Sequence, residues 1–344
     1  MAKKRQSVPV VDEIKVAKKK SPAEFFAKDV ESENSNISVP EGIITLRIPT
    51  GSIKLDYLLG GGIPAGRITQ IYGDEGVGKT SLLYRIIAEA QKMGLSTVLV
   101  TEEKSFDREF ATACGIDIDD TNTFWRFEGN FGEATLNKVI EAIRLTNCQL
   151  VGIDSIAAIN PLDLMVKGFK EDVKDSDAKI GAQAKIVTEW ITKTLAPVAR
   201  NNVAVIVINQ FRANIKPFGG DYIVTGGYAL QYLTTLKLKM FKHDHDKERP
   251  NLVKTTITID KGKDMKIKVF QKCEVEFIHG KGIQKEYELA RLADELKIVN
   301  KAGPWYSYDS QKWQGMEQLV TFIKENQDFS DELENKIREE LKVE

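Results

Sequence analysis

The chain has 344 residues, which is enough for two or three domains with a sizeable hydrophobic core. Apolar residues make up 42 % and charged residues 29 %, and 49 basic side chains against 50 acidic ones give a net charge of −1. This composition is typical of a soluble globular protein and excludes a chain that is disordered or basic throughout. A polyanionic partner would therefore have to bind to a local basic patch.

The N-terminal segment, residues 1–44, differs from the rest of the chain. Its first 20 residues carry seven Lys or Arg and two acidic residues, a local charge of +5, and the remainder predicts a short helix and a Ser/Asn-rich linker. No hydrophobic segment follows the basic start, and no apolar run reaches the roughly 18 residues of a membrane span. Three widely separated cysteines form no CxxC pair. We therefore expect a cytoplasmic protein without membrane contact.

Residues 45–283 have the pattern of an α/β core with a mostly parallel sheet. Four β-branched apolar runs, ITQIY, LSTVLV, QLVGI and VAVIVI, alternate with helical stretches. Parallel strands are buried on both faces, so they form continuous apolar runs. Beyond about residue 220, the runs LKLKMF, VKTTITI and KIKVF alternate apolar and polar residues instead, which predicts antiparallel strands at an edge of the sheet.

Residues 284–344 turn helical and acidic, with nine basic and fourteen acidic side chains and a charge of −5. We expect a small helical C-terminal domain here. The segment 237–281, by contrast, has twelve basic and seven acidic residues, a charge of +5. The net charge of −1 is therefore a sum of opposed segments, and it excludes only a strong attraction of nucleic acid to the whole surface.

A phosphate-binding loop follows the run ITQIY. The sequence from Gly73 to Thr80 fits GxxxxGK[ST] at every fixed position, and a helical pattern begins directly after it. In such a loop backbone N–H groups wrap around the β-phosphate, the lysine reaches the β- and γ-phosphates, and the hydroxyl ligates Mg²⁺. The residues assigned to ATP here are Gly73, Asp74, Glu75, Gly76, Val77, Gly78, Lys79, Thr80 and Ser81.

Carboxylates follow two further runs and complete the predicted site. Asp154 comes directly after QLVGI, where the carboxyl ends of parallel strands meet beside the loop, and we expect it to hold Mg²⁺ through water. Hydrolysis also needs a carboxylate that activates water, and Thr101, Glu102 and Glu103 follow LSTVLV. Adjacent strand residues point to opposite faces, so only one of the two glutamates can serve, and the pattern alone leaves the choice open.

The chain resembles the RecA-type DNA strand-exchange recombinases over roughly residues 46 to 344. The stretches that carry the resemblance are PTGSIKLDYLLGGGIPAGRITQIYGDEGVGKT (49–80), IDSIAAINP (153–161), VINQFR (207–212), TGGYAL (225–230) and AGPWYSY (302–308). In addition, SPAEFFAKDV (21–30) is similar to the N-terminal part of UvsX-like phage recombinases. That similarity favours a virus-encoded member, which would act in the host cytoplasm.

The resemblance implies roles for residues around the nucleotide. It places the water-activating glutamate at Glu103 and the adenine contacts at Asp107 and Phe110. It also places the sensor of the γ-phosphate at Gln210, where the run VAVIVINQ ends. An amide suits that role because it can bond to a phosphate oxygen without adding charge.

The resemblance also implies contacts between subunits. Lys261 and Lys263 align with a lysine pair that reaches the ATP of a neighbouring subunit and neutralises charge on its γ-phosphate, although a basic turn is the alternative. An apolar pair in a polar tail is expected to seek burial, so Phe25 and Phe26 are predicted to dock on the neighbour. Tyr232 aligns with an interface aromatic, with a core position as the alternative.

Two loops are implied to bind DNA. The glycine-rich segment 211–227 resembles the second DNA loop of the family, in which Arg212 would contact phosphate and Ile215 would be wedged between bases. Segment 162–181 corresponds to the first DNA loop, but its lysines are countered by acidic residues, so Lys185 on the following helix is the better phosphate contact. The residues assigned to DNA are Lys185, Arg212, Ile215, Gly226 and Gly227.

Together these features predict an ATP- and Mg²⁺-dependent recombinase. It would form a helical filament of identical subunits on single-stranded DNA, pair that strand with homologous double-stranded DNA and hydrolyse ATP in a DNA-dependent manner. Single-strand binding and loader proteins are further expected partners. Two alternatives stay open, a hexameric helicase or RadA/KaiC-like ATPase, and an ATP-gated DNA scaffold with little turnover. The pattern KHDHDKE, with His243 and His245, is interpreted as a solvated turn, and no transition metal is assigned to it.

Overall fold

The computed structural model of this chain describes residues 46–101, 106–129, 132–159, 161, 176–213, 222–224, 226–243, 249 and 251–342. All of them belong to one compact unit, Thr45–Glu344. The expected N-terminal segment with Phe25 and Phe26 lies outside the described residues, as do Glu103, Ile215 and most of the first DNA loop. None of the described helices is long and apolar enough to cross a membrane.

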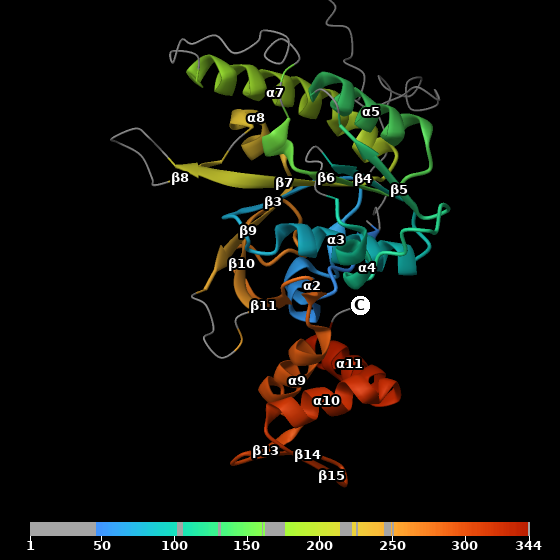
Figure 1. The fold of residues 1–344 in the computed structure, drawn as a ribbon, viewed down its shortest axis with the longest axis vertical. Coiled ribbons are helices and arrows are strands. Elements are labelled where there is room, and N and C mark those ends of the chain that lie inside the picture. Colours follow the sequence, from blue (N-terminus) through green and yellow to red (C-terminus); the bar gives the residue numbers. More distant parts are fainter. Residues whose placement is uncertain are drawn as a thin grey trace, which may run out of the picture. The chain divides into compact units, whose positions relative to one another are not determined.

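Ten strands form one mostly parallel sheet, which confirms the expected α/β fold (Figure 1). They are β3 (Ile68–Gly73), β4 (Thr97–Thr101), β5 (Phe124–Glu128), β6 (Leu150–Asp154), β7 (Ala204–Ala213), β8 (Tyr222–Val224), β9 (Leu236–Lys242), β10 (Leu252–Gly262), β11 (Lys272–Ile278) and β12 (Gly282–Ile283). The order β9-β3-β7-β6-β4-β5 is parallel throughout, and β10, β11 and β12 extend it antiparallel beyond β9. A separate pair joins β1 (Arg47–Ile48) to β2 (Ile63–Pro64).

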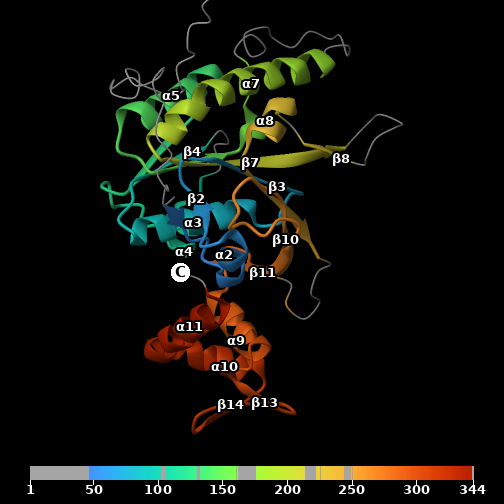
Figure 2. The ribbon, with the colours of Figure 1, turned by 180° about the vertical axis from the view of Figure 1, so that it is seen from behind.

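Helices cover both faces of this sheet, as Figures 1 and 2 show. They are α2 (Ile53–Leu59), α3 (Lys79–Lys92) and α4 (Arg108–Ala113) on one face, and α5 (Gly132–Leu145), α7 (Ser176–Arg200) and α8 (Gly227–Leu233) on the other. A short 3₁₀ helix, Ile156–Ala158, follows β6.

Strand β7 illustrates why the apolar runs form the centre of the sheet. Its successive side chains point to opposite faces, so Ile206 and Ile208 join the core beneath α3 while Val205 and Val207 join the core beneath α7. All four are essentially inaccessible to solvent. A strand that is buried on both sides must be apolar at every position, and this requirement is what the sequence pattern detected.

The antiparallel extension was predicted correctly for two strands and wrongly for the third. LKLKMF and VKTTITI lie in β9 and β10, but KIKVF, residues 266–270, is a loop, and the third strand is β11. The loop turns at Asp264, whose carbonyl accepts from Ile267 N, and Phe270 has a positive φ of 66°. The alternation arises because Ile267 is buried between two lysines, of which Lys266 faces solvent and Lys268 is half-buried with its ammonium over the Tyr57 ring.

The C-terminal part contains a small sheet that the sequence pattern did not predict. Its elements are α9 (Lys285–Glu295), β13 (Asn300–Ala302), β14 (Trp305–Tyr308), β15 (Gln311–Gln314), α10 (Met316–Glu325) and α11 (Gln327–Leu341). The three short antiparallel strands bury Tyr306 and Trp313 against the helices. Strands of three or four residues are too short for a clear alternation of apolar and polar positions.

Helix α2 joins the C-terminal part to the core. Ser52 caps the helix by accepting from Leu55 N at 3.2 Å, and its hydroxyl donates to Glu288 Oε1 of α9 at 2.7 Å. Lys54 N donates to the same carboxylate oxygen at 3.0 Å. Ile53, the first residue of α2, is buried in the core of the C-terminal part. One helical turn therefore supplies both the polar and the apolar contacts of this junction.

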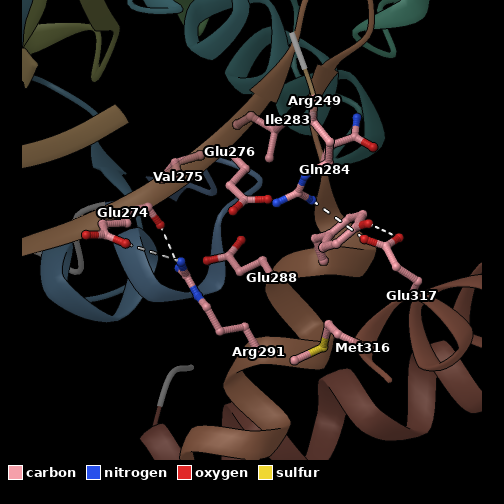
Figure 3. A pocket seen from close by; sticks show the side chains of 11 residues that line it. Arg249, Glu274, Val275, Glu276, Ile283, Gln284, Glu288, Arg291, Met316 and Glu317 are labelled. Carbon is pink, nitrogen blue, oxygen red and sulfur yellow. Dashed lines mark hydrogen bonds and ion pairs between the residues drawn. The ribbon is translucent and has the colours of Figure 1, made fainter. Parts of the chain in front are cut away.

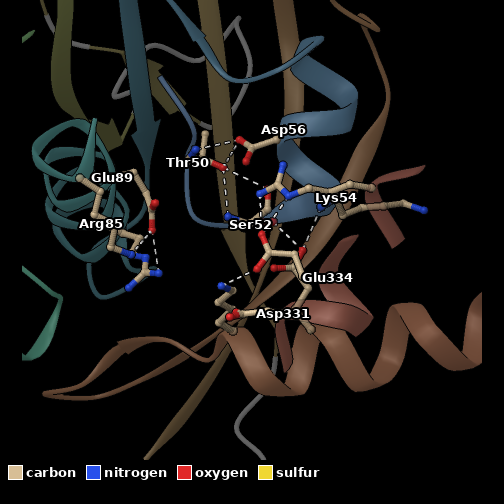
Figure 4. Close-up of polar contacts among 12 residues, drawn as sticks. Thr50, Ser52, Lys54, Asp56, Arg85, Glu89, Asp331 and Glu334 are labelled. Carbon is tan, nitrogen blue, oxygen red and sulfur yellow. Dashed lines mark hydrogen bonds and ion pairs between the residues drawn. The ribbon is translucent and has the colours of Figure 1, made fainter. Parts of the chain in front are cut away.

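A buried carboxyl group lies in the same turn (Figure 4). Thr50 donates to Asp56 Oδ1 from its backbone N and from its hydroxyl, each at 2.7 Å, and Asp56 is only 1 % exposed. Burial raises the pKa of Asp56 to about 7, although the bonds from Thr50 act in the opposite direction. The folded protein therefore binds a proton here over a pH range in which the unfolded chain has released it.

We expect Asp56→Asn to flatten the dependence of stability on pH. The proton on Asp56 favours the native state below its unfolded pKa, near 3.8, and this contribution is lost as the pH rises through about 7. The free energy of unfolding of Asp56→Asn should therefore rise relative to that of wild type as the pH increases from 4 to 8. The difference between the two proteins should increase by at most about 4 kcal/mol over this range. Urea unfolding at several pH values measures it, with Glu141→Gln on the exposed face of α5 as the control for charge. If the free energies of unfolding of wild type and Asp56→Asn changed equally with pH, the raised pKa of Asp56 would be contradicted.

Candidate functional site

The phosphate loop leaves the sheet at the carboxyl end of β3, between β7 and β9. A Cβ atom on Gly73 would lie 2.2 Å from the Met240 carbonyl oxygen of β9, so only glycine fits at the start of the loop. Gly76 and Gly78 have positive φ angles of 70° and 89°, which side chains disfavour. Helix α3 begins at Lys79, directly after Gly78. The predicted order of strand, loop and helix is thus confirmed.

Two contacts hold the loop in shape. Lys79 is 7 % exposed, and its Nζ donates to the carbonyl oxygens of Gly73, at 3.1 Å, and Asp74. Thr255 of β10 donates from its buried hydroxyl to the Val77 carbonyl oxygen at 2.9 Å. The ammonium group of Lys79 therefore lies within the curve of the loop, where an anion would be bound.

The structure brings together the two residues assigned to magnesium. Thr80 Oγ1 donates to Asp154 Oδ2 at 2.7 Å. The contact follows from the sheet, because the loop after β3 and the end of β6 lie at the same edge. Hydroxyl and carboxylate oxygens are the hard donors that Mg²⁺ prefers, so the pair fits this ion.

A cleft of about 440 Å³ opens beside the loop. Ten of the predicted residues line it: Glu75, Gly76, Gly78, Lys79, Thr80, Ser81, Asp107, Phe110, Asp154 and Gln210. Residues that the sequence analysis did not identify also line it, among them Tyr84, Phe106, Phe277 and His279. The cleft is large enough for a nucleotide-sized ligand.

Aromatic rings form one wall of the cleft. The ring of Tyr84 lies 5.6 Å from that of Phe110 and 6.2 Å from that of Phe106, between ring centroids. Burial, followed by the charge of Asp154, raises the pKa of Tyr84 above its usual range, so the phenol stays neutral. Asp107 caps α4 and accepts from Phe110 N at 3.1 Å. One signal for Tyr84 was present in the sequence, because it follows Thr80 by four residues and so shares a helix face with it.

Phe277 and His279 come from a part of the sheet that gave no such signal. They lie at the end of β11 and directly after it, far along the chain from the loop. The Phe277 ring packs so closely on the loop that a Cβ atom on Gly78 would lie 2.9 Å from it. Pairing of β11 with β10, which itself pairs with β9, brings these residues to the cleft.

Gln210 lies in the cleft, but the strand does not end there as expected. Its position is in register with Gly73 on β3, and its backbone N donates to Asn209 Oδ1 at 2.9 Å. Strand β7 continues to Ala213 and pairs antiparallel with β8, so part of the predicted DNA loop is a hairpin. Arg212 lies in that strand, opposite Ile223.

Lys261 and Lys263 do not line the cleft of their own chain. Lys261 Nζ donates to the carbonyl oxygens of Gln231, at 3.0 Å, and Tyr232, at 2.8 Å, near the end of α8. Burial, assisted by the charges of Lys263 and Lys237, lowers the pKa of Lys261. The cation is therefore held at the carboxyl end of a helix, on another part of the surface.

Three of the five residues assigned to DNA, Lys185, Gly226 and Gly227, lie at α7 and at the start of α8. Lys185 and Gly227 line the same shallow groove, and a Cβ atom on Gly227 would lie 3.0 Å from Ala184 Cβ. Gly226 caps α8 with a positive φ of 90°. Tyr232, on α8, is 67 % exposed, so the alternative of a core position is wrong. Its ring stacks on that of Tyr228, with centroids 6.2 Å apart.

Comparison with known proteins identifies both parts of the chain. Residues 40–284 match the RecA N-terminal domain, and residues 288–342 match the RecA C-terminal domain. A protein named Protein RecA from Porphyromonas gingivalis is 33 % identical over 300 residues, which are 86 % of this chain and 85 % of the relative. Protein RecA from Aquifex aeolicus is 34 % identical over 295 residues, 85 % of this chain and 83 % of the relative.

The bond between Thr255 and Val77 can be tested by substitution. Thr255→Val keeps the shape of the side chain but leaves the buried Val77 carbonyl without its donor, so we expect the free energy of unfolding to fall by about 1–3 kcal/mol. Binding of a fluorescent ATP analogue should weaken as well, because the loop loses its anchor. Denaturant unfolding and nucleotide titration measure the two effects, and Thr258→Val on the same strand is the matched control. If Thr255→Val and Thr258→Val had equal free energies of unfolding and equal nucleotide affinities, the role of Thr255 as an anchor of the loop would be contradicted.

Proposed function

The chain belongs to the RecA family of ATP-dependent DNA recombinases, and we propose that it works as a DNA-dependent ATPase in a helical filament on single-stranded DNA. The observation that carries the proposal is that the Lys79 loop, the pair Thr80–Asp154 and Gln210 line one cleft. In the filament, the bound strand is paired with homologous double-stranded DNA, and sequence is read by base pairing rather than by side chains.

The phosphate end of ATP is bound by the loop. Backbone N–H groups and the Lys79 ammonium would surround the β- and γ-phosphates, and the bonded pair Thr80 and Asp154 would hold Mg²⁺. Bound Mg²⁺ neutralises charge on the phosphates. Glu103, which follows the end of β4 by two residues, orients and deprotonates the attacking water.

The adenine end of ATP lies against the aromatic wall. Phe110 lines the cleft and would stack on the base, and its ring packs against that of Tyr84, which lines the cleft beside it. Asp107 fixes the first turn of α4 by its bond to Phe110 N, and so holds the ring in place. His279, directly after β11, lines the same cleft and would contact the base.

The neighbouring subunit completes the site. Lys261 and Lys263 do not line the cleft of their own chain, and Lys261 binds the end of α8, a helix that also exposes Tyr228 and Tyr232. We assign this face to the contact with the next subunit, whose ATP the two lysines reach. A cation supplied in this way stabilises charge on the γ-phosphate during its transfer. ATP thereby joins subunits, which explains why a filament would assemble only when it is bound.

The signal from nucleotide to DNA runs along β7. Gln210 lines the cleft, and directly after it the strand pairs with β8, from Phe211 to Ala213. The groove with Lys185 and Gly227 lies at α8, the helix that follows β8 in the chain. A shift of Gln210 on loss of the γ-phosphate would move the DNA-binding segment between them. Arg212 and Ile215 belong to that segment and would contact the bound strand.

Adding single-stranded DNA should raise the rate of ATP hydrolysis, and Glu103→Gln should remove that activity. Loss of a general base lowers turnover by roughly 10²–10⁴-fold. Glu102→Gln is the matched control, because it removes the same group from the adjacent position. The rates are measured by phosphate release with and without single-stranded DNA. If Glu102→Gln were the inactive variant, the two roles would be exchanged, and a wild-type rate indifferent to DNA would contradict the proposal.

Mixing two inactive variants tests whether the lysines act on the neighbour. Lys79→Ala lacks the phosphate lysine, and the double variant Lys261→Ala/Lys263→Ala lacks the pair that reaches across. In a random mixture of equal amounts, about one interface in four combines the intact half of each variant. We therefore expect about a quarter of the wild-type ATPase rate. A mixture no more active than its components would contradict action in trans, and closed rings in electron micrographs with DNA would favour a ring-forming ATPase.

A further inference from the structure

Three polar side chains join the strand that begins the phosphate loop to the strand that carries Lys261. Tyr72 directly precedes Gly73 on β3, and its hydroxyl donates to Asp260 Oδ2 of β10 at 2.5 Å. Strand β9 lies between these two strands. Its Lys237 ammonium is 3.4 Å from the same carboxylate oxygen and 4.9 Å from the centroid of the Tyr72 ring. We call Tyr72, Lys237 and Asp260 the Asp260 network, and it spans three strands.

A β-bulge places Asp260 in this network. On β10, Ile259 pairs with Leu238 of β9. Lys261 pairs with the adjacent Lys237, so Asp260 is an extra residue between two neighbouring pairs. A bulge bends its strand and changes the direction of the side chains at that point. The direction in which Lys261 leaves the strand is therefore set by the same bulge that turns Asp260 toward β3.

The charges of the network also act on Lys261. Burial, followed by the charges of Lys263 and Lys237, lowers the pKa of Lys261, so Lys237 is close enough to repel it. The Lys237 side chain is only 12 % exposed, and Asp260 is the carboxylate that pairs with it. Burial and the bond to Asp260 raise the pKa of Tyr72 above its usual range, so its phenol remains a donor at neutral pH. Asp260 thus offsets a repulsion that would displace Lys261.

The network has no direct part in the nucleotide site of its own subunit. None of its three side chains lines the cleft. It lies instead directly before the lysine pair, and on the other side of the bulge Lys263 N donates to the Thr235 carbonyl oxygen at 3.1 Å. The backbone that carries the two lysines is therefore held on both sides. A cation that acts on a ligand of another molecule needs such support from its own chain, because the geometry of a reacting group determines its effect.

We propose that Asp260 positions the lysine pair for its action on the ATP of the neighbouring subunit. The carboxylate, held by Tyr72 and Lys237, fixes the bulge from which the two lysines extend. This inference rests on the proposed function, in which Lys261 and Lys263 act in trans. It gives β3 two tasks, because the strand that begins the phosphate loop of one subunit also holds, through Tyr72, the cations that this subunit supplies to the next. An oriented cation stabilises charge on the γ-phosphate without having to reorganise during the reaction.

Mixtures of inactive variants test the proposal. The parent mixture combines Lys79→Ala, which supplies the lysine pair, with Lys261→Ala/Lys263→Ala, which supplies the phosphate loop. Asp260→Ala is then added to one component at a time, and phosphate release is measured with single-stranded DNA. In the Lys79→Ala component it should lower the rate about tenfold or more, since a misplacement of about 1 Å can cost roughly 10²-fold. In the other component the lysines are already absent, so the rate should stay near that of the parent mixture.

The outcomes separate this proposal from the function on which it rests. Equal rates for the two placements of a folded Asp260→Ala would overturn the positioning role and leave the proposed function intact. A parent mixture no more active than its components would contradict the action of the lysines in trans, and the positioning role would be wrong with it.

A second variant keeps the test decisive if Asp260→Ala disturbs the fold. Tyr72→Phe keeps the ring and removes only the hydroxyl that donates to Asp260. In the Lys79→Ala component, whose own phosphate loop is already inactive, it should lower the rate of the mixture about threefold or more. Tyr287→Phe removes the same kind of bond, from a phenol to the Glu317 carboxylate, and is the matched control that should leave the rate unchanged. Equal rates with Tyr72→Phe and Tyr287→Phe would overturn the proposal.

Discussion

The way in which the phosphate loop leaves β3 is the constraint on which the rest of the site depends. β3 lies between two parallel neighbours, and the Met240 carbonyl oxygen of β9 leaves no space for a side chain on Gly73. The loop must therefore leave the sheet as bare backbone, with α3 directly behind it. Because β3, β6 and β7 run parallel, their carboxyl ends meet at one edge, and Thr80, Asp154 and Gln210 come together there without any contact in sequence.

Strand β11 connects this edge with the C-terminal part. Phe277, near the end of this strand, packs on the phosphate loop, while Val275 and Glu276 line a pocket beside α9 (Figure 3). The C-terminal part is held to the core by Glu288, which accepts from the turn that begins α2. A buried carboxylate needs hydrogen bonds from specific directions, so such a junction admits fewer arrangements than an apolar contact would.

Most of the core could be predicted from the sequence, and the errors have one physical origin. A strand buried on both faces must be apolar along its length, which made β3, β4, β6 and β7 visible. Alternation of apolar and polar residues is a weaker signal, because a loop that buries one side chain, Ile267, produces the same pattern over 266–270. The pairing of β7 with β8 and the small sheet around Trp313 were not predicted, because β8 and the strands of the small sheet have only three or four residues and depend on their partners.

By itself, the sequence determined the phosphate loop, the parallel strands and the carboxylate after β6, since glycine spacing and burial act over a few neighbouring residues. Only the tertiary structure decided that Tyr84, Phe277 and His279 line the cleft and that Lys261 turns away from it. These arrangements depend on the pairing of β9, β10 and β11. Such contacts join segments that are far apart in the chain, and a pattern of neighbouring residues contains no information about them.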